Sequence, residues 1–278
     1  YDIPELIRTN SIIGWIDSIQ KTTPQDLRRA KDKFLVKENL RIFIAGNLDN
    51  LDDIKNIISV NLKMVKSGEV SLSPNMPEAI GRPKQVKFEN TYEDIGLGDE
   101  EQATIELEAV LPSFNPDADL KKIATQRLLS HVMSDLAFEK LRVENKLCYS
   151  AGSGLSSGTT FQSMYLESKL DAQHIEKAVS LMEEIIDGVK EGVYEQKFID
   201  SKELIINRFI SNERSTADIL DSTVSSYVKY NSNLLLGDLI GAMEAVTYND
   251  TVDFAKEYLQ RDRFVLEIVK PKTIKPTA

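Results

Sequence analysis

An internal repeat constrains the fold of this chain more than any other feature of its sequence. The segment TTPQDLRRAKDKFLVKENLRIFIAG, residues 22–46, aligns without gaps on VTYNDTVDFAKEYLQRDRFVLEIVK, residues 246–270. Cap, helix and strand residues recur at matching places, and the aligned pairs are Thr23 with Thr247, Asp26 with Asp250, Phe34 with Tyr258, Leu35 with Leu259 and Leu40 with Phe264. Such a repeat predicts two copies of one structural module.

Each copy predicts a capped helix followed by a strand. The Thr can accept hydrogen bonds from free backbone N–H groups, and the Asp three residues later suits the positive end of the helix dipole. The segments LRIFIAG and RFVLEIV, which follow the two helices, are rich in β-branched and aromatic residues, as strands are. Capped amphipathic helices are common, so a chance match is the alternative to a true repeat.

The positions of the two copies predict how the chain is divided. We expect residues 84–278 to form one complete module and residues 1–66 to be the C-terminal remnant of a similar upstream module. Residues 67–83, between them, hold three prolines and two glycines. Proline fixes φ and removes a ladder donor, so this segment predicts an extended linker.

The complete module predicts an α+β fold. Residues 103–111, ATIELEAVL, alternate apolar and acidic side chains, which indicates a strand with one buried face. A long helix is expected over residues 115–142, with Asn115 as its cap and Pro116 at its first position. Further strands are expected at 84–90, 148–154, 159–168 and 263–269, and further helices at 171–190, 194–212, 215–231, 237–244 and 248–259. This grouping predicts a mostly antiparallel sheet with helices mainly on one face.

Composition excludes several classes of partner. The chain has 278 residues and a formal net charge of −10, which argues against binding to nucleic acid or to an anionic membrane surface. No stretch approaches the roughly 18 apolar residues that a membrane span requires. A single cysteine excludes an internal disulfide framework and fits a reducing compartment. We therefore expect a soluble protein of the cytoplasm or of an organelle interior.

Metal-binding and nucleophilic motifs are absent from the sequence. The two histidines, His131 and His174, are far apart, and neither H-E-x-x-H nor H-x-x-E-H occurs. We therefore expect no metal bound by this chain, and His131 to be a helix residue with an ordinary hydrogen bond. Cys148 could pair with a histidine as a nucleophile, but a small buried thiol is favoured. The segment AGSGLSSG lacks the Lys-Ser/Thr of a phosphate loop, so a hairpin connection through Gly154 to Gly158 is the better interpretation.

Arg142 and Tyr149 are the remaining candidates for function. Arg142 closes an apolar helical run, and Tyr149 opens the small-residue segment that follows. One interpretation is structural: a cation at the negative end of a helix, and a strand aromatic packed in a core. The other is that both side chains belong to a binding site.

The segment FEKLRVENKLCYSAGSG, residues 138–154, resembles a motif of the insulinase/pitrilysin family of zinc metallopeptidases. The family pattern is roughly F-x-x-L-R-x-x-x-x-L-x-Y, and the matching residues are Phe138, Leu141, Arg142, Leu147 and Tyr149. Cys148 departs from it, because the family commonly has Gly or Ala there. The resemblance extends over residues 84–270 and, as a truncated copy, over residues 1–62.

The resemblance implies a function for the chain as part of a larger enzyme. In this family, similar modules enclose a chamber; one module carries zinc on H-x-x-E-H and a downstream Glu, and an opposite module turns Arg and Tyr toward the substrate backbone. It implies that this chain is the C-terminal, substrate-binding and chamber-forming part of a zinc endopeptidase. Arg142 and Tyr149 would bind the peptide substrate, and no catalytic residue would lie in this segment.

Zinc and the catalytic base would then come from an upstream region or from a partner chain that carries a zinc-bearing insulinase-like module. The chain is not expected to cleave peptides alone. The alternative is a non-catalytic structural or assembly subunit of the same fold, as in the core subunits of respiratory complexes. Retention of Arg142 and Tyr149 favours the first hypothesis, because a purely structural module has no need of them.

Overall fold

The structure is a computed structural model, and it describes residues 16–70, 86–92, 100–157, 162–212, 215–230, 232 and 236–272. The chain divides into two compact units. The larger, which we call the sheet unit, comprises mainly residues 81–214 and 222–278, and the smaller, the helical unit, comprises residues 2–80 and 215–221. The predicted linker at 67–83 lies mostly outside the described residues, so the domain boundaries stay a prediction.

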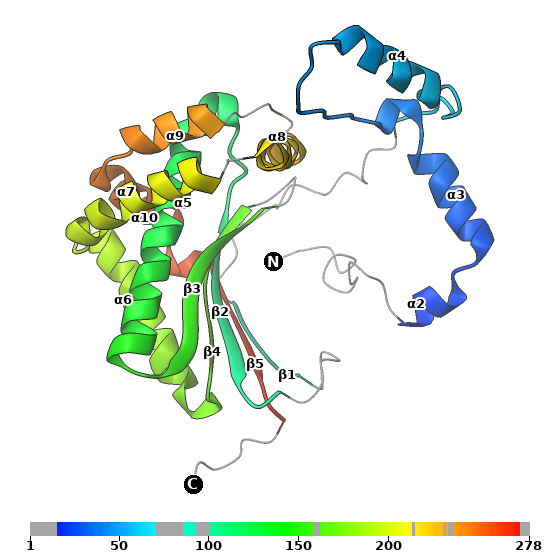
Figure 1. Cartoon of the computed structure of the whole chain (residues 1–278). Helices are drawn as coiled ribbons and strands as arrows, with labels where there is room; N and C mark the ends of the chain where they lie inside the picture. The colour runs from blue at the N-terminus through cyan, green and yellow to red at the C-terminus, as the bar shows by residue number, and fades with distance from the viewer. Residues whose placement is uncertain are drawn as a thin grey trace. The chain divides into compact units, whose positions relative to one another are not determined.

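Five strands form the sheet of the sheet unit, in the order β1-β5-β2-β4-β3 (Figure 1). Their bounds are β1 (Val86–Thr91), β2 (Ala103–Leu111), β3 (Cys148–Ser157), β4 (Gln162–Leu170) and β5 (Phe264–Lys270). β1 pairs with β5 in parallel, and the other three pairings are antiparallel. The predicted α+β fold with a mostly antiparallel sheet is confirmed.

Helices cover one face of this sheet (Figure 1). They are α5 (Pro116–Ala137), α6 (Ile175–Glu191), α7 (Glu195–Asn212), α9 (Leu236–Ala245) and α10 (Tyr248–Tyr258), while α8 (Thr216–Tyr230) contributes residues to both units. α5 packs on β3 and β4, and α6 packs on β2. Of the helices in the described ranges, none is long and apolar enough to cross a membrane.

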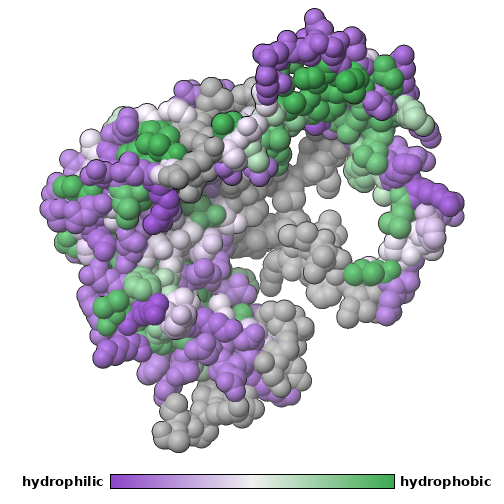
Figure 2. All heavy atoms as spheres, viewed as in Figure 1, coloured by the Kyte–Doolittle hydropathy of each residue, from purple (hydrophilic) through white to green (hydrophobic). Residues whose placement is uncertain are grey.

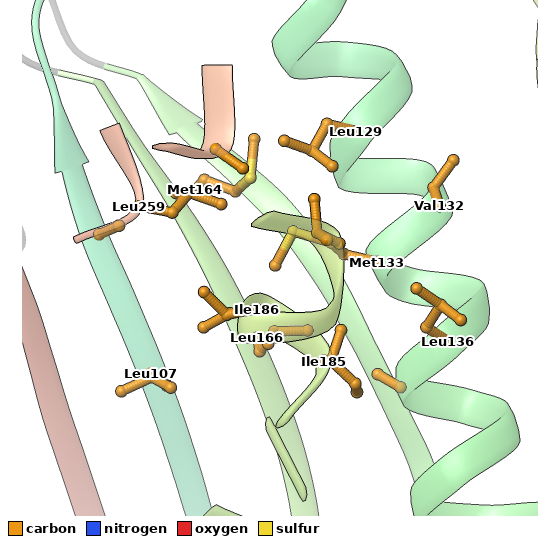
Figure 3. Close-up of a cluster of buried hydrophobic side chains, with 14 of the residues drawn as sticks. Leu107, Leu129, Val132, Met133, Leu136, Met164, Leu166, Ile185, Ile186 and Leu259 are labelled. Carbon is orange, nitrogen blue, oxygen red and sulfur yellow. The ribbon is translucent and has the colours of Figure 1, made fainter. Parts of the chain in front are cut away.

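The core lies between α5, α6 and the sheet. Along β2 the side chains alternate between buried and half-buried, so that Ile105 and Leu107 face the helices, as the sequence predicts. Asn115 caps α5 as expected, since its side-chain oxygen accepts from the N–H of Asp117 at 2.9 Å. Figure 3 shows the resulting contact, in which apolar side chains of α5 meet those of the strands and of α6, among them Leu129, Val132, Met133, Leu136, Met164, Leu166, Ile185 and Ile186.

The connection between β3 and β4 differs from the expectation. β3 continues to Ser157, so Gly154 lies inside the strand rather than in a hairpin connection. Gly154 is opposite Tyr165 of β4, and a Cβ at this glycine would lie 2.4 Å from the Tyr165 hydroxyl oxygen. The glycine therefore makes room for a cross-strand aromatic side chain, and any larger residue would displace it.

The helical unit contains α2 (Ile16–Lys21), α3 (Pro24–Phe34), a 3₁₀ turn η1 (Lys37–Asn39) and α4 (Leu51–Leu62). The predicted strand at residues 40–46 is wrong, because this described segment forms no strand. Its composition suits a strand, but a strand is stable only when its backbone groups find ladder partners. Figure 2 shows hydrophobic residues gathered on the surface over α4 and beside α3.

The sheet face opposite the helices carries a group of glutamates. Glu106 of β2 stands in register with Glu167 on β4 and with Glu267 on β5, and Glu108 follows two residues later. Burial raises the pKa of Glu106 to about 7, and the carboxylates of Glu108, Glu267 and Glu167 add to the shift. Like charges directly opposite each other destabilise a sheet, so this face favours a protonated Glu106.

This cluster predicts that stability falls as pH rises. Folded Glu106 keeps its proton to about pH 7, whereas its ordinary pKa is 4.5. Its contribution to the free energy of unfolding is therefore complete below pH 4.5 and is lost as pH rises through 7. Glu106→Gln should be more stable than wild type by about 1–2 kcal/mol at pH 8, after allowance for solvent screening, and nearly equal at pH 4.

Urea unfolding at both pH values checks this expectation. Glu203→Gln, a change at an exposed glutamate of α7, is the control and should leave the pH profile unaltered. If the Glu106→Gln and wild-type profiles run parallel from pH 4 to pH 8, Glu106 does not hold the proton.

Candidate functional site

The chain between α5 and β3 is held by an unusual turn. α5 does not stop at Ala137 but continues as a π-helical segment, η2 (Phe138–Glu144), a geometry that is rare and frequent at functional sites. The N–H of Leu147 donates to the carbonyl oxygen of Leu141 at 2.9 Å, and the N–H of Asn145 donates to that of Lys140 at 3.2 Å. Lys146 completes the turn with a left-handed φ of 55°.

Two buried leucines anchor this turn. Leu141 is fully buried in η2 and Leu147 is nearly so, and both belong to the core that α5 forms with the sheet. The register of β3 shifts between Cys148 and Ser150, so Tyr149 is the extra residue of a bulge. Its side chain is 77% exposed. The residues on either side of the turn are thus fixed, while Tyr149 is exposed and Arg142 is half-buried.

Arg142 and Tyr149 are brought into contact. The guanidinium carbon of Arg142 lies over the Tyr149 ring, 4.6 Å from its centroid, and over the Phe138 ring, 4.9 Å from its centroid. We call these three residues the Arg142 stack. Each such cation–π contact contributes about 0.5–1 kcal/mol at an exposed site. Tyr149 is therefore not the core aromatic of the structural interpretation, although Arg142 does close the helix.

The stack leaves polar groups available to a ligand. Within the described ranges, no hydrogen bond or ion pair engages the Arg142 guanidinium or the Tyr149 hydroxyl. Guanidinium N–H donors lie in the plane of the group, so a guanidinium that stacks on aromatic rings can still donate hydrogen bonds from its edges. The arrangement can donate several hydrogen bonds to carbonyl or carboxylate oxygens from a cation of fixed orientation.

The remaining candidates stay apart from the stack. His131, on α5, packs edge-on against Phe209 at 6.3 Å, and burial lowers its pKa with smaller contributions from Arg208 and Arg127. His174 lies in a separate short 3₁₀ turn before α6. Cys148 is a free thiol that is only partly buried, against the expectation of a buried one, because β3 is an edge strand. The described part of the chain contains no group of three or more His, Cys, Asp or Glu residues that could hold a metal ion.

Two features could not be read from the sequence, one in the Arg142 stack and one on the sheet face opposite the helices. Phe138 matched the family motif, but its ring contact with Arg142 was not expected; the four-residue spacing on a helix, which puts both on one side, was the available signal. The glutamates around Glu106 were also missed. Their signal was the alternation of acids along residues 103–111, but the pairing with Glu167 and Glu267 depends on strand order, which the sequence does not state.

A sequence profile described as the peptidase M16 inactive domain matches residues 21–204. This match includes the Arg142 stack and confirms the resemblance found in the sequence, since the insulinase/pitrilysin peptidases are the M16 peptidases. No curated protein sequence matches the chain.

Solved structures with the same fold are numerous. A protease from Helicobacter pylori superposes with a TM-score of 0.74 and 16% identity, covering 93% of this chain and 61% of that one. A putative M16-like peptidase from Alicyclobacillus acidocaldarius gives 0.72 and 17%, covering 95% and 62%. A chain of complex III2 from Candida albicans gives 0.72 and 13%, covering 94% and 62%. This chain thus spans about three fifths of the length of each, and identities this low show the fold alone.

The stack predicts a measurable coupling between Arg142 and Tyr149. In a double-mutant cycle with Arg142→Met and Tyr149→Leu, we expect about 0.5–1 kcal/mol of coupling in the free energy of unfolding, because each variant removes one side of the cation–π contact. Urea unfolding of the four proteins measures it. A cycle with Tyr149→Phe in place of Tyr149→Leu is the control: it keeps the ring and should show little coupling. A value near zero in the first cycle would contradict the stacked geometry.

Proposed function

Because the chain belongs to the M16 peptidases through their inactive domain, we propose that it is the substrate-binding and chamber-forming part of a zinc endopeptidase. In this proposal, zinc and the catalytic base come from another region of the same polypeptide or from a partner chain. The substrate is a peptide or an unfolded protein segment. The chain by itself is not an active peptidase.

The Arg142 stack is the observation that carries the proposal. A cation held over two rings, with its edges free and a phenol beside it, is suited to hydrogen-bond an extended peptide backbone. A surface with only a structural role would gain nothing from an outward Tyr149 that is 77% exposed. The rigid turn beneath it keeps both side chains in place, which lowers the entropy cost of binding.

The two side chains have different roles in this proposal. Zinc, where it is bound, polarises the scissile carbonyl and activates water. Arg142 donates to a peptide carbonyl and holds the substrate in both ground and transition states. The Tyr149 hydroxyl donates to the oxygen on which negative charge develops, so its contribution is largest in the transition state.

The helical unit fits the same proposal. Residues 1–66 would be the C-terminal remnant of an upstream module, residues 67–83 a linker, and residues 84–278 the complete module without a zinc motif. The two capping boxes support this division, because Thr23 with Asp26 and Thr247 with Asp250 make the same pair of reciprocal hydrogen bonds.

A structural or assembly subunit of the same fold is the second candidate. It is favoured by one observation, the similarity in fold to a chain of complex III2 from Candida albicans. The two candidates differ in what Tyr149 does. A structural subunit would tolerate loss of the phenol without any change in peptide cleavage by the assembly that contains it.

We expect the chain alone to bind no stoichiometric zinc and to cleave no peptide. A tetrahedral zinc site needs three or four ligands, and two distant histidines cannot supply them. Metal analysis of protein stripped with a chelator, reloaded with zinc and dialysed provides the measurement. One tightly held zinc per chain, or cleavage of a peptide library by the pure chain, would contradict the division of roles.

Tyr149→Phe should lower kcat of the zinc-containing assembly about 10- to 100-fold and change KM little. Loss of one oxyanion donor costs about 100- to 1,000-fold in enclosed sites, and a chamber open to water should give less. Arg142→Ala should chiefly raise KM, because a permanent cation binds both states of the substrate. Steady-state kinetics on several peptides measures both effects.

Tyr258→Phe is the control for loss of a phenol elsewhere, because it removes the hydroxyl on α10 to which Lys122 donates and leaves the residues of the Arg142 stack unchanged. It should leave kcat and KM unchanged. If Tyr149→Phe, folded and assembled normally, also retains full kcat and KM, the second candidate function is the correct one.

A further inference from the structure

The turn that carries Arg142 is fixed at both ends by the core, but its middle depends on one side chain. Leu141 and Leu147 are buried on either side, and the residues between them are half-buried or exposed. Within the described part of the chain, Asn145 alone among these intervening residues has a side-chain hydrogen bond: its Nδ2 donates to the carbonyl oxygen of Lys140 at 2.8 Å. The backbone N–H of Asn145 donates to the same oxygen at 3.2 Å.

A π-helical turn needs such support because its hydrogen bonds compete with those of an α-helix. In an α-helix the N–H of Asn145 would donate to Leu141, four residues back, whereas here it donates to Lys140, five residues back. The carbonyl oxygen of Leu141 accepts instead from the N–H of Leu147, at 2.9 Å. A carbonyl oxygen has two lone pairs, so that of Lys140 can accept from both groups of Asn145. The side-chain bond therefore favours the π pairing over the α pairing.

The backbone at Asn145 does not itself require an asparagine. Asparagine is favoured where φ is positive, but Asn145 has a φ of −100°, and it is Lys146 that has the left-handed φ of 55°. A lysine at positive φ costs free energy, so the hydrogen bonds on either side must hold it there. Asn145 is also half-buried, whereas Glu144 and Lys146 are exposed. The bond to Lys140, rather than local chain geometry, thus accounts for this amide.

The acceptor of this bond is anchored to the rest of the sheet unit. The Nζ of Lys140 lies 5.8 Å from the centroid of the Tyr194 ring and 4.0 Å from Oε2 of Glu184 on α6. The N–H of Tyr194 in turn donates to the hydroxyl oxygen of Tyr248 on α10, at 2.9 Å. Asn145 therefore holds the turn against a residue that contacts packed helices.

The bond encloses the residue on which the candidate site depends. Arg142 lies in the loop that the bond between Lys140 and Asn145 closes, and Tyr149 follows Asn145 by four residues. Arg142 contacts the Phe138 ring at the start of the turn and the Tyr149 ring after its end. Each residue of an α-helix corresponds to a rotation of about 100°, so a change of pairing by one residue would turn Tyr149 away from Arg142.

We propose that Asn145 is a positioning residue: its side-chain amide holds the η2 turn through Lys140 and so keeps Arg142 stacked on Phe138 and Tyr149. Without the amide, the turn populates both pairings, and the guanidinium is correctly oriented for only part of the time. Peptide binding then weakens, while the chemical step is unaffected. This last consequence rests on the proposed function, whereas the effect on the Arg142 stack does not.

NMR of the full chain tests the effect on the stack without any peptidase activity. In wild type, the Hδ protons of Arg142 should resonate upfield of their usual position, because the side chain lies over two rings. Asn145→Ala should remove at least about half of this upfield shift. The methyl resonances of Leu141 and Leu147 should stay in place, since the core holds those side chains. Asn145→Asp should act in the same way at pH 8, because an ionised carboxylate keeps the shape but cannot donate.

Asn39→Ala is the matched control. The Nδ2 of Asn39 also donates to a carbonyl oxygen five residues back, that of Phe34 at the end of α3, at 3.0 Å. Loss of this bond should leave the Arg142 resonances unchanged. If Asn145→Ala and Asn145→Asp also leave them unchanged, the core leucines set the stack by themselves and the inference is wrong.

Kinetics of the zinc-containing assembly test the consequence for peptide binding. Asn145→Ala should raise KM about 3- to 10-fold, as expected for loss of one hydrogen bond, and should change kcat less than about 2-fold. In the double variant with Arg142→Ala, the loss of Asn145 should cause no further rise in KM, because Asn145 acts through Arg142. Asn39→Ala should change neither constant.

Effects on KM that multiply in the double variant would mean that Asn145 acts independently of Arg142, and would overturn the inference. The proposed function fails through a different result, an Arg142→Ala assembly that forms normally with an unaltered KM. In that case the Arg142 resonances still decide the role of Asn145.

Discussion

The packing of α5 on β3 and β4 is the contact on which the rest of the structure depends. Its buried side chains fix the distance and angle between helix and sheet, and its last turn passes without a break into η2. Because Leu141 and Leu147 are held in the same core, the turn between them has little freedom. The position of Arg142 is thus a result of core packing, and the candidate surface around it is fixed by the packed interior.

Features that depend on neighbours in the sequence could be predicted from it. The alternation along β2, the Asn115 cap and the two capping boxes all follow from side chains within a few residues of one another. The strand expected at residues 40–46 would need neighbouring strands, and the described residues provide none for it. Its composition alone cannot provide the hydrogen-bond partners of a sheet. A similarly β-branched and aromatic segment forms a strand in β5, where two neighbours exist. The difference lies in tertiary context rather than in local propensity.

The candidate site likewise has features that the sequence predicts and features that it does not. The spacing of Arg142 and Tyr149 indicated a pair at a helix end and a strand start, and the structure places their side chains in contact. The π-helical turn, the left-handed Lys146 and the bulge at Tyr149 could not be predicted, because backbone hydrogen bonds rather than residue types define them. These three irregularities turn the two side chains toward each other. Local departures from regular geometry at such a point are expected where a surface has been shaped for binding.

The interior position of β5 in the sheet has a consequence for biosynthesis. This strand follows all the helices of the sheet unit in the chain, yet it separates β1 from β2. While the ribosome is still making the helices, β1 has no neighbour in the sheet and β2 has an open edge. The nascent chain must therefore keep an incomplete sheet from pairing with other chains until its final strand emerges. A premature stop codon shortly before β5 would remove an interior strand of the sheet and leave β1 without its neighbour.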